Sequence, residues 1–196
     1  MKEAKLKSDQ KRWDKRFRGK EFAFGKEANL FLRRHIRLLP KGKALDIAAG
    51  EGRNAVFLAQ HGFDVDAVDI SEMGLRKTQK LSKKMGIKIH TILVDLNTYQ
   101  IGKNQYDLIA NFYFLNRRLI PGIKKGLKKG GRVIFETYLL EQRTLGTGGP
   151  KNPRYFLKLN ELLKFFKGFR ILLYREGIYK EGRKRKAIAS LIAEKC

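Results

Sequence analysis

The sequence lacks several features that would point to a membrane, secreted or metal-binding protein. Its only cysteine is Cys196, so neither a disulfide framework nor a thiolate metal site is expected. No apolar run approaches the roughly 20 residues that a transmembrane helix needs, and residues 1–7 lack the apolar core of a secretion signal. His35, His61 and His90 have no partner at metal-ligand spacing. The sequence therefore predicts a cytoplasmic protein without a metal site and without a membrane partner.

Acidic residues are also scarce, and the net charge is +25, from 44 Lys and Arg against 19 Asp and Glu. The excess lies in two flanks: residues 1–43 carry 15 basic and 5 acidic side chains, residues 44–116 carry 8 of each, and residues 117–196 carry 21 and 6. Such a charge attracts polyanions, and it is equally typical of a lysine-rich solvated surface. RNA therefore stays open as a partner, and the oligomeric state is not indicated.

No linker rich in proline, glycine or serine and no internal repeat divides the 196 residues. We therefore expect a single domain over residues 1–196, with a helical cover over residues 1–40 and a core over residues 41–196. The cover is predicted to hold helices over residues 8–18, with Ser8 or Asp9 as N-cap, and over residues 27–39, which Pro40 ends.

Short runs rich in Val, Ile and Leu alternate with helical stretches through the core. The predicted strands are residues 44–48, 65–70, 87–94, 106–112 and 132–137, and the predicted helices are residues 53–61, 72–85 and 117–129. After a helix over residues 159–166, strands over residues 169–174 and 186–193 flank a short charged turn at residues 180–185. This order predicts an α/β fold: a doubly wound, mostly parallel seven-stranded sheet with a C-terminal antiparallel hairpin and helices on both faces.

Residues 44–54, Ala-Leu-Asp-Ile-Ala-Ala-Gly-Glu-Gly-Arg-Asn, describe a buried strand, a tight turn and the start of a helix. Gly50 and Gly52 flank the turn, where a side chain would block the approach of a ligand to the backbone. The helix that begins near Arg53 directs its free amide groups at the same point. Asp69 follows Gly50 by 19 residues, close to the spacing of about 20 at which a strand-end carboxylate reaches both ribose hydroxyls. The pattern predicts a nucleotide-sized pocket.

Two cofactors compete for this pocket. Residues 50–55, Gly-Glu-Gly-Arg-Asn-Ala, satisfy the G-x-G-x-x-G/A fingerprint of dinucleotide binding. However, Asp46 and Glu51 place negative charge beside the turn, which disfavours a pyrophosphate. S-adenosylmethionine carries a sulfonium cation and an amino group that Asp46 could hold, so it is the predicted cofactor, and a nicotinamide oxidoreductase is the alternative.

Several segments match motifs of one enzyme family: Leu45-Asp-Ile-Ala-Ala-Gly-Glu-Gly52, Val68-Asp-Ile-Ser71, Val94-Asp-Leu96, Tyr106-Asp-Leu-Ile109 and Leu127-Lys-Lys-Gly-Gly131. In these segments the chain resembles the class I S-adenosylmethionine-dependent methyltransferases. The resemblance implies that the cofactor is bound by Asp46, Ala48, Gly50, Gly52, Arg53, Asn54, Asp69, Ile70, Asp95, Leu96 and Asn111. Ala48 replaces the family's first glycine, a departure that shifts the methionine end of the cofactor without removing the site.

A narrower resemblance involves residues 52–54, Gly-Arg-Asn, and the N-terminal residues 13–17, followed by Phe24-Gly25. These segments are similar to tellurite-resistance-type and related small-molecule methyltransferases. The similarity implies that the N-terminal segment folds over the cofactor and excludes water from the transfer site. The candidate side chains for this role are Trp13, Phe17, Phe22 and Phe24. Simple packing of these aromatics onto the domain is the alternative.

Asn111 and Tyr113 lie at the carboxyl end of the fourth strand, the position from which this fold contacts the acceptor, and we expect them to be polar contacts there. The expected reaction is in-line methyl transfer from S-adenosylmethionine to a small, anionic or thiol-like acceptor, which leaves S-adenosylhomocysteine. An RNA methyltransferase that uses the basic flanks is the main alternative. A non-catalytic cofactor-binding protein and a nicotinamide oxidoreductase are less favoured.

Overall fold

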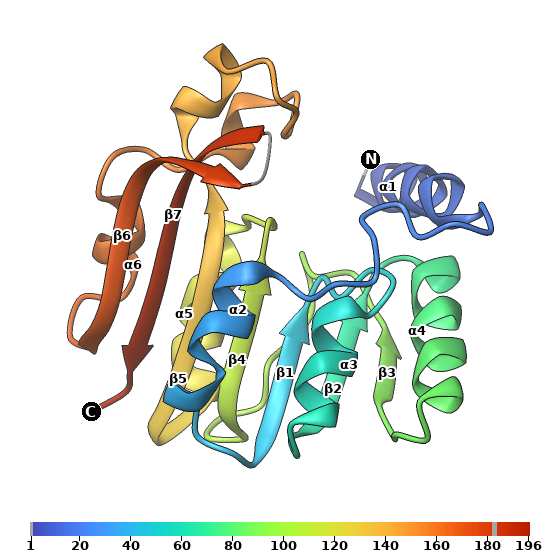
Figure 1. Ribbon diagram of the computed structural model, residues 1–196, viewed down its shortest axis with the longest axis horizontal. Coiled ribbons are helices and arrows are strands. Elements are labelled where there is room, and N and C mark those ends of the chain that lie inside the picture. The colour runs from blue at the N-terminus through green and yellow to red at the C-terminus, as the bar shows by residue number, and fades with distance from the viewer. Residues whose placement is uncertain (1, 182–183) are drawn as a thin grey trace.

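The order and direction of the strands confirm the predicted fold class. The computed structural model describes residues 2–181 and 184–196, and its seven-stranded sheet has the order β3-β2-β1-β4-β5-β7-β6 (Figure 1). The strands are β1 Lys43–Ile47, β2 Asp64–Asp69, β3 His90–Leu93, β4 Tyr106–Phe112, β5 Leu127–Tyr138, β6 Arg170–Glu181 and β7 Lys184–Glu194. Strands β1 to β5 pair in parallel, whereas β7 pairs antiparallel with both β5 and β6.

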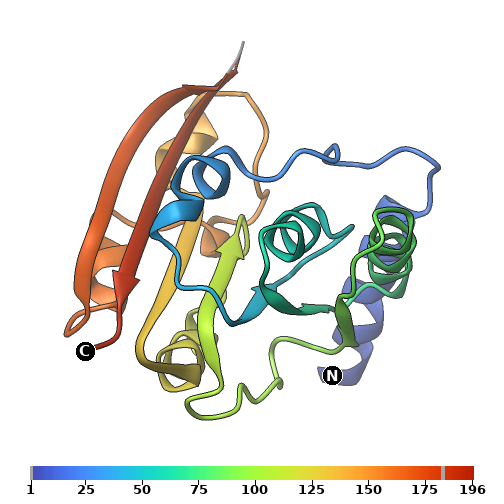
Figure 2. The ribbon, with the colours of Figure 1, turned by 60° about the horizontal axis from the view of Figure 1, so that its bottom comes forward.

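Helices cover both faces of this sheet. They are α1 Lys2–Phe17, α2 Leu30–His35, α3 Arg53–Gln60, α4 Glu72–Lys84, α5 Ile120–Gly126 and α6 Glu161–Phe165. In β4, Leu108 and Ala110 pack in the hydrophobic cluster beneath α2 and α3, and Ile109 packs in the cluster beneath α5 and α6. The middle of the strand is therefore apolar on both faces, as its run of Leu, Ile and Ala predicted. Figure 2 shows α1 beside α4 at one end of the sheet.

Both N-terminal helices differ from their predicted bounds. Helix α1 begins at Lys2 rather than at residue 8, so neither Ser8 nor Asp9 is its N-cap. The residues before Ser8 include the good helix formers Lys, Glu, Ala and Leu, and these extend the helix toward the N-terminus. Helix α2 begins only at Leu30, because the Asn29 side chain accepts hydrogen bonds from the amides of Phe31 and Leu32 and caps it.

The predicted helix over residues 117–129 is also wrong in extent. It divides into a 3-10 turn at Arg117–Leu119 and helix α5, and β5 begins directly afterwards at Leu127. The C-terminal strands are longer than predicted, because β6 and β7 pair from Arg170↔Glu194 up to Glu181↔Lys184. The predicted turn at residues 180–185 is therefore mostly strand, and its residues 182–183 lie outside the described residues.

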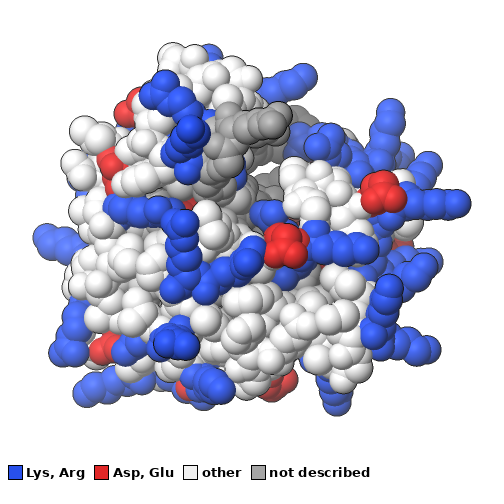
Figure 3. Space-filling model, in the orientation of Figure 1, with Lys and Arg blue, Asp and Glu red and all other residues white. Residues whose placement is uncertain are grey.

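Basic side chains are numerous on the face of the molecule seen in the orientation of Figure 1. Figure 3 shows Lys and Arg scattered across one whole face, with few Asp or Glu between them. No helix among the described residues is both long enough and apolar enough to cross a membrane.

Candidate functional site

The backbone after β1 makes an unusual turn at the carboxyl edge of the sheet. Ala48, Gly50 and Gly52 have φ angles of +55°, +57° and +82°, and Gly52 is the N-cap of α3. Glycine adopts this left-handed region readily, whereas alanine does so at a cost of about 1–2 kcal/mol. Ala48, which stands where the resemblance led us to expect a glycine, therefore has a strained backbone.

The glycine turn is also a packing surface. A Cβ atom on Gly52 would lie 2.5 Å from the side chain of Thr78 on α4, and one on Gly50 would lie 3.3 Å from the Phe17 ring of α1. From the opposite side, a Cβ atom on Gly74 of α4 would lie 2.7 Å from the Gly50 carbonyl oxygen. The glycines therefore permit α1 and α4 to approach the turn, in addition to any role toward a ligand.

Gly74→Ala is expected to destabilise the protein, although alanine favours a helix over glycine by about 1 kcal/mol. The new methyl group would meet the backbone oxygen of Gly50, which cannot move without disturbing the turn. We expect a loss of about 1–3 kcal/mol in the free energy of unfolding, measured in urea.

Gly122→Ala is the matched control, because Gly122 is also helical. Its added Cβ atom would have no neighbour closer than 3.8 Å. This variant should gain about 0.5–1 kcal/mol. Equal effects of the two substitutions would contradict the close approach of α4 to the turn.

Two carboxylates lie beside the turn, Asp46 on β1 and Asp69 at the end of β2. The Asp69 carboxylate accepts hydrogen bonds from the amides of Gly50 (2.8 Å) and Ser71 (2.7 Å), and its burial raises its pKa. Burial, together with the charge of Asp69, raises the pKa of Asp46 to about 7, although Arg53 acts in the opposite direction. Among the described residues, the buried Oδ2 atom of Asp46 has no hydrogen-bond partner.

This pair of carboxylates fits a cationic ligand. A buried carboxylate oxygen without a partner is costly, and a cation or an ammonium donor would relieve that cost. A phosphate-bearing ligand would instead add negative charge to a site that already holds two acidic groups. The buried carboxylates Asp46 and Asp69 therefore favour a sulfonium cofactor over a dinucleotide.

The charge of Glu51 does not contribute to this preference, contrary to the argument from sequence. Lys77 of α4 lies 2.7 Å from the buried Glu51 carboxylate, and the amide of Ala23 donates to its other oxygen at 2.8 Å. Lys77 also donates to the carbonyl of Glu21. Glu51 is thus neutralised by Lys77, and it fastens the N-terminal segment to the turn.

The N-terminal segment lies over the site. Asp14 of α1 accepts hydrogen bonds from the Ser71 hydroxyl (2.6 Å) and the Met73 amide (3.1 Å) at the start of α4. Phe17 is buried against the turn and stacks on Trp13 at 5.5 Å. The other two aromatics of the segment have weaker packing: Phe24 is half exposed, and Phe22 lies near the ammonium groups of Lys26 and Lys77.

Three more of the predicted cofactor residues, Ile70, Asp95 and Leu96, lie at or near the same edge of the sheet. The Asp95 carboxylate accepts from the Asn97 amide, and Leu96 is buried. Val94, just before them, donates its amide to the Asp69 carbonyl, which places this segment beside the end of β2. Ile70, between Asp69 and Ser71, is half-buried.

Two further predicted residues are engaged with the protein itself. Asn54 accepts a hydrogen bond from the Asn29 amide (2.9 Å), and Asn111 donates to the Phe114 carbonyl (2.7 Å). Both side chains are buried. Their roles toward a ligand therefore stay predictions.

A polar network beyond β4 was missed from the sequence. The fully buried Glu136 of β5 accepts hydrogen bonds from Asn29, Ser190, Tyr113 and Arg175 at distances between 2.7 and 3.2 Å. A charged residue within the apolar run Val133-Ile-Phe-Glu-Thr137 was the signal that could have identified Glu136. Its partners come from distant parts of the chain and carry no local signal.

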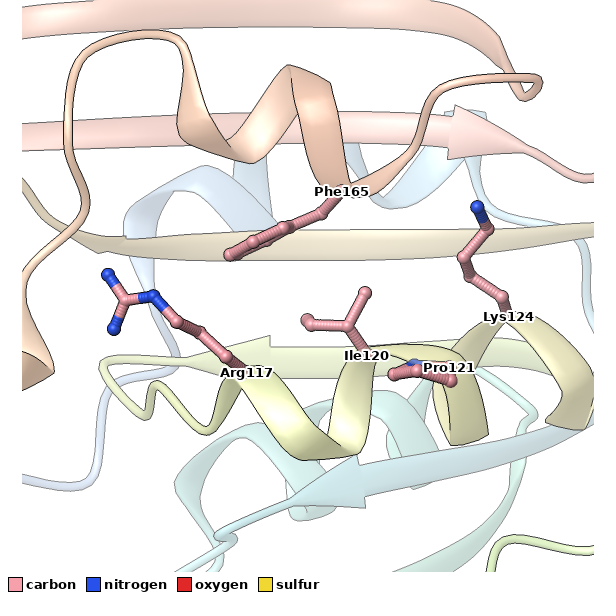
Figure 4. Close-up of a pocket in the computed structure, with 5 residues that line it drawn as sticks. All are labelled: Arg117, Ile120, Pro121, Lys124 and Phe165. Carbon is pink, nitrogen blue, oxygen red and sulfur yellow. The ribbon is translucent and has the colours of Figure 1, made fainter.

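A surface hollow of about 520 Å³ lies away from these residues, between α5 and α6 (Figure 4). Arg117, Ile120, Pro121, Lys124 and Phe165 line it. Arg117 forms an ion pair with Glu161 of α6. Its position in the hollow is therefore explained by the packing of α5 against α6. None of the predicted cofactor residues lines this hollow. No cluster of metal ligands is found in residues 2–181 and 184–196.

Comparison with known proteins agrees with the resemblance inferred from the sequence. A family model described as "Tellurite resistance protein TehB" matches residues 28–187. A probable S-adenosyl-L-methionine-dependent methyltransferase TehB from Haemophilus influenzae (strain KW20 / Rd) is 31% identical over 146 residues, which are 72% of this chain and 51% of the relative. The chain thus spans about half the length of the curated relative that it matches.

Solved structures show the same fold. The crystal structure of TehB from Haemophilus influenzae aligns with a TM-score of 0.75 at 23% identity, over 86% of this chain and 63% of that one. An S-adenosylmethionine-dependent methyltransferase from Mesorhizobium loti aligns with a TM-score of 0.69 at 17% identity, over 87% of this chain and 100% of that one. At these identities the structural matches establish the fold alone.

Proposed function

We infer the activity of this chain from the premise that it belongs to the TehB family, whose model matches residues 28–187. We propose that it binds S-adenosylmethionine and transfers the methyl group to a small acceptor. The observation that carries this proposal is the Oδ2 atom of buried Asp46, which lies beside a second buried carboxylate and has no hydrogen-bond partner within the described part of the chain. When bound, S-adenosylmethionine supplies a methyl group activated by a sulfonium centre.

The chain's own residues bind and orient the cofactor. Asp46 would hold its ammonium group, and Asp69 would accept hydrogen bonds from its ribose hydroxyls. A carboxylate has about four acceptor sites, so Asp69 retains capacity for a ligand while backbone amides fix its position. Asp95 and Leu96 would lie along the adenine edge. Positioning is the main contribution to a displacement of this type, because no covalent intermediate with the protein is needed.

The proposed acceptor is small and anionic or thiol-like. The N-terminal segment is fastened over the glycine turn through Asp14, Glu51 and Arg53, and a segment held in this way suits a closed site for a small molecule better than an open groove for a polymer. The basic side chains are scattered over the face shown in Figure 3 instead of forming one track there. Both observations favour a small molecule over RNA.

Incubation of the purified protein with methyl-labelled S-adenosylmethionine tests the proposal directly. The acceptors would be a panel of small thiols, carboxylates and chalcogenides and, in parallel, total RNA. We expect label in a small acceptor and none in RNA at physiological salt. Label that enters only RNA would contradict the acceptor class, and calorimetry that finds no binding of S-adenosylhomocysteine would contradict the activity itself.

A further inference from the structure

Strand β6 forms one end of the sheet, and no other described strand pairs with its outer edge. It runs over 12 residues, whereas the strand at the opposite end, β3, has only four. Figure 2 shows β6 at the outer margin of the sheet, at the opposite end from α1 and α4. The edge of a strand presents backbone N–H and C=O groups that can pair with another chain, and short edge strands are one way in which proteins prevent this. The outer edge of β6 is therefore a surface to which a further strand can be added.

Exposed apolar side chains also gather on β6. Among the described residues, nine large hydrophobic side chains are exposed, and three of them, Ile171, Leu172 and Ile178, lie on this strand. Ile178 is 47% exposed. Leu159 is 65% exposed, and the amide that follows it in the chain donates to the Glu176 carboxylate of β6. Apolar surface of this kind is stabilised when a partner covers it.

Two charged side chains flank Ile178 on the same face of the strand. Side chains alternate between the faces of a strand, so Glu176 and Lys180 lie on the face of Ile178. Neither charge forms an ion pair with another residue of the described chain. Glu176 accepts hydrogen bonds from the Asn160 amide (3.1 Å) and the Tyr174 hydroxyl, and a carboxylate has about four acceptor sites. Both charges are therefore available to a partner.

The order of these charges is self-complementary. Two copies of one strand that pair in antiparallel fashion are related by a two-fold axis perpendicular to the sheet, and a residue on the axis lies opposite itself. With Ile178 on the axis, Glu176 of each copy lies opposite Lys180 of the other. A register centred on any other residue between 175 and 180 would set a charge opposite itself, or would leave Glu176 and Lys180 without an opposite charge. The charges thus select one register.

We propose that β6 docks a second copy of this chain, through antiparallel pairing of the two β6 strands about Ile178. The two Ile178 side chains would meet at the centre, with an ion pair between Glu176 and Lys180 on either side of them. On the other face of the strand, Gly177 would lie opposite Tyr179, and the missing side chain leaves room for the ring. Each chain carries a net charge of +25, so long-range repulsion opposes the pairing and salt weakens that repulsion.

Sedimentation of the full chain at about 5 to 500 µM tests this inference. At about 0.3 M salt, where the Debye length is below about 8 Å, we expect an equilibrium between monomer and dimer. Lys180→Glu would set Glu176 opposite a second carboxylate at both ends of the pairing. The dimer should weaken about 10-fold or more, although the net charge of each chain falls.

Lys129→Glu is the matched control, because it makes the same change of charge at an exposed position near the start of β5. This variant should dimerise at least as tightly as the wild type. Circular dichroism of both variants shows whether they keep the fold.

A disulfide tests the register independently of Lys180. Ile178→Cys, made with Cys196→Ser to remove the exposed native thiol, would place two thiols opposite each other. Their Cα atoms would lie about 4.5–5.5 Å apart, within the range of a disulfide. Leu172→Cys with Cys196→Ser is the control: Leu172 is exposed on the same strand, but its two copies would lie about 40 Å apart in this register. Oxidised glutathione should cross-link the Ile178→Cys chains about 10-fold faster than the Leu172→Cys chains.

Three results would each overturn the inference. They are a wild-type chain that stays monomeric up to the highest concentration, a dimer that a folded Lys180→Glu variant leaves unchanged, and equal rates of cross-linking at positions 178 and 172. If Lys180→Glu does not fold, the rates of cross-linking decide the question alone.

Discussion

Asp46→Asn is expected to stabilise the ligand-free protein at pH 8 and to weaken its binding of the cofactor. Burial raises the pKa of Asp46 from 3.8 to about 7, so the folded protein holds a proton that the unfolded chain releases. Stability therefore falls as the pH rises from about 4 to about 7, by about 1.4 kcal/mol per pH unit. Asparagine keeps the shape without the charge, so the variant should be about 2–4 kcal/mol more stable than the wild type at pH 8.

Cofactor binding should change in the opposite direction. A cation binds the ionised carboxylate, so the affinity of the wild type for S-adenosylmethionine should rise about 10-fold between pH 6 and pH 8. Asp46→Asn should lower this affinity about 10- to 100-fold at pH 8 and flatten most of its pH dependence. Calorimetry at the two pH values measures the binding, and denaturation in urea measures the stability.

Asp107→Asn is the control for both measurements. The Lys128 ammonium and the amide of Lys43 hold the pKa of Asp107 below its usual value, so its contribution to stability is present near neutral pH and is lost in acid. Asp107→Asn should have a lower free energy of unfolding than the wild type at pH 8, and it should bind the cofactor as the wild type does. An Asp46→Asn protein that binds cofactor like the wild type would show that Asp46 does not face the ligand.

The fold and the geometry of the glycine turn beside Asp69 could be predicted because their signals are local. The turn from Asp46 to Gly52 and the carboxylate at Asp69 follow directly from strand ends, and parallel strands bring such ends to one edge of the sheet. The strands could be predicted as well, because each of them is marked by a short local run of apolar residues. Helix bounds were less well predicted, since Asn29 caps α2 where the apolar pattern alone suggested an earlier start.

What could not be predicted depends on partners that are distant along the chain. Glu51 is neutralised by Lys77, which lies 26 residues away, so its charge was given too much weight. Asn29 reaches Glu136 across 107 residues, and Lys186 reaches Tyr113 across 73. Such pairs are fixed by the packing of whole elements onto the sheet, and neither periodicity nor local spacing contains them.

The network around Glu136 should respond strongly when only one of its charges is removed. Glu136 is fully buried and cannot reach water, so Arg175→Leu would leave a buried carboxylate without its cation. We expect this variant to lose about 3–5 kcal/mol in the free energy of unfolding. Glu136→Leu should cost about 2–3 kcal/mol, since the partly exposed Arg175 can turn to solvent while the donors of Asn29 and Ser190 lose their acceptor.

The double variant Glu136→Leu/Arg175→Leu decides whether the two charges act as a pair. It removes both groups, so its loss should be smaller than the sum of the single losses by about 2 kcal/mol or more. The exposed pair Glu72 and Arg76 on α4 provides the control, with an expected coupling below about 0.5 kcal/mol. Additive losses at Glu136 and Arg175 would mean that Arg175 contributes by packing on Phe31 and Tyr179 and not through its charge. A coupled result would instead show that Glu136 and Arg175 act as a charge pair, within the network in which the same carboxylate accepts a hydrogen bond from the Tyr113 hydroxyl.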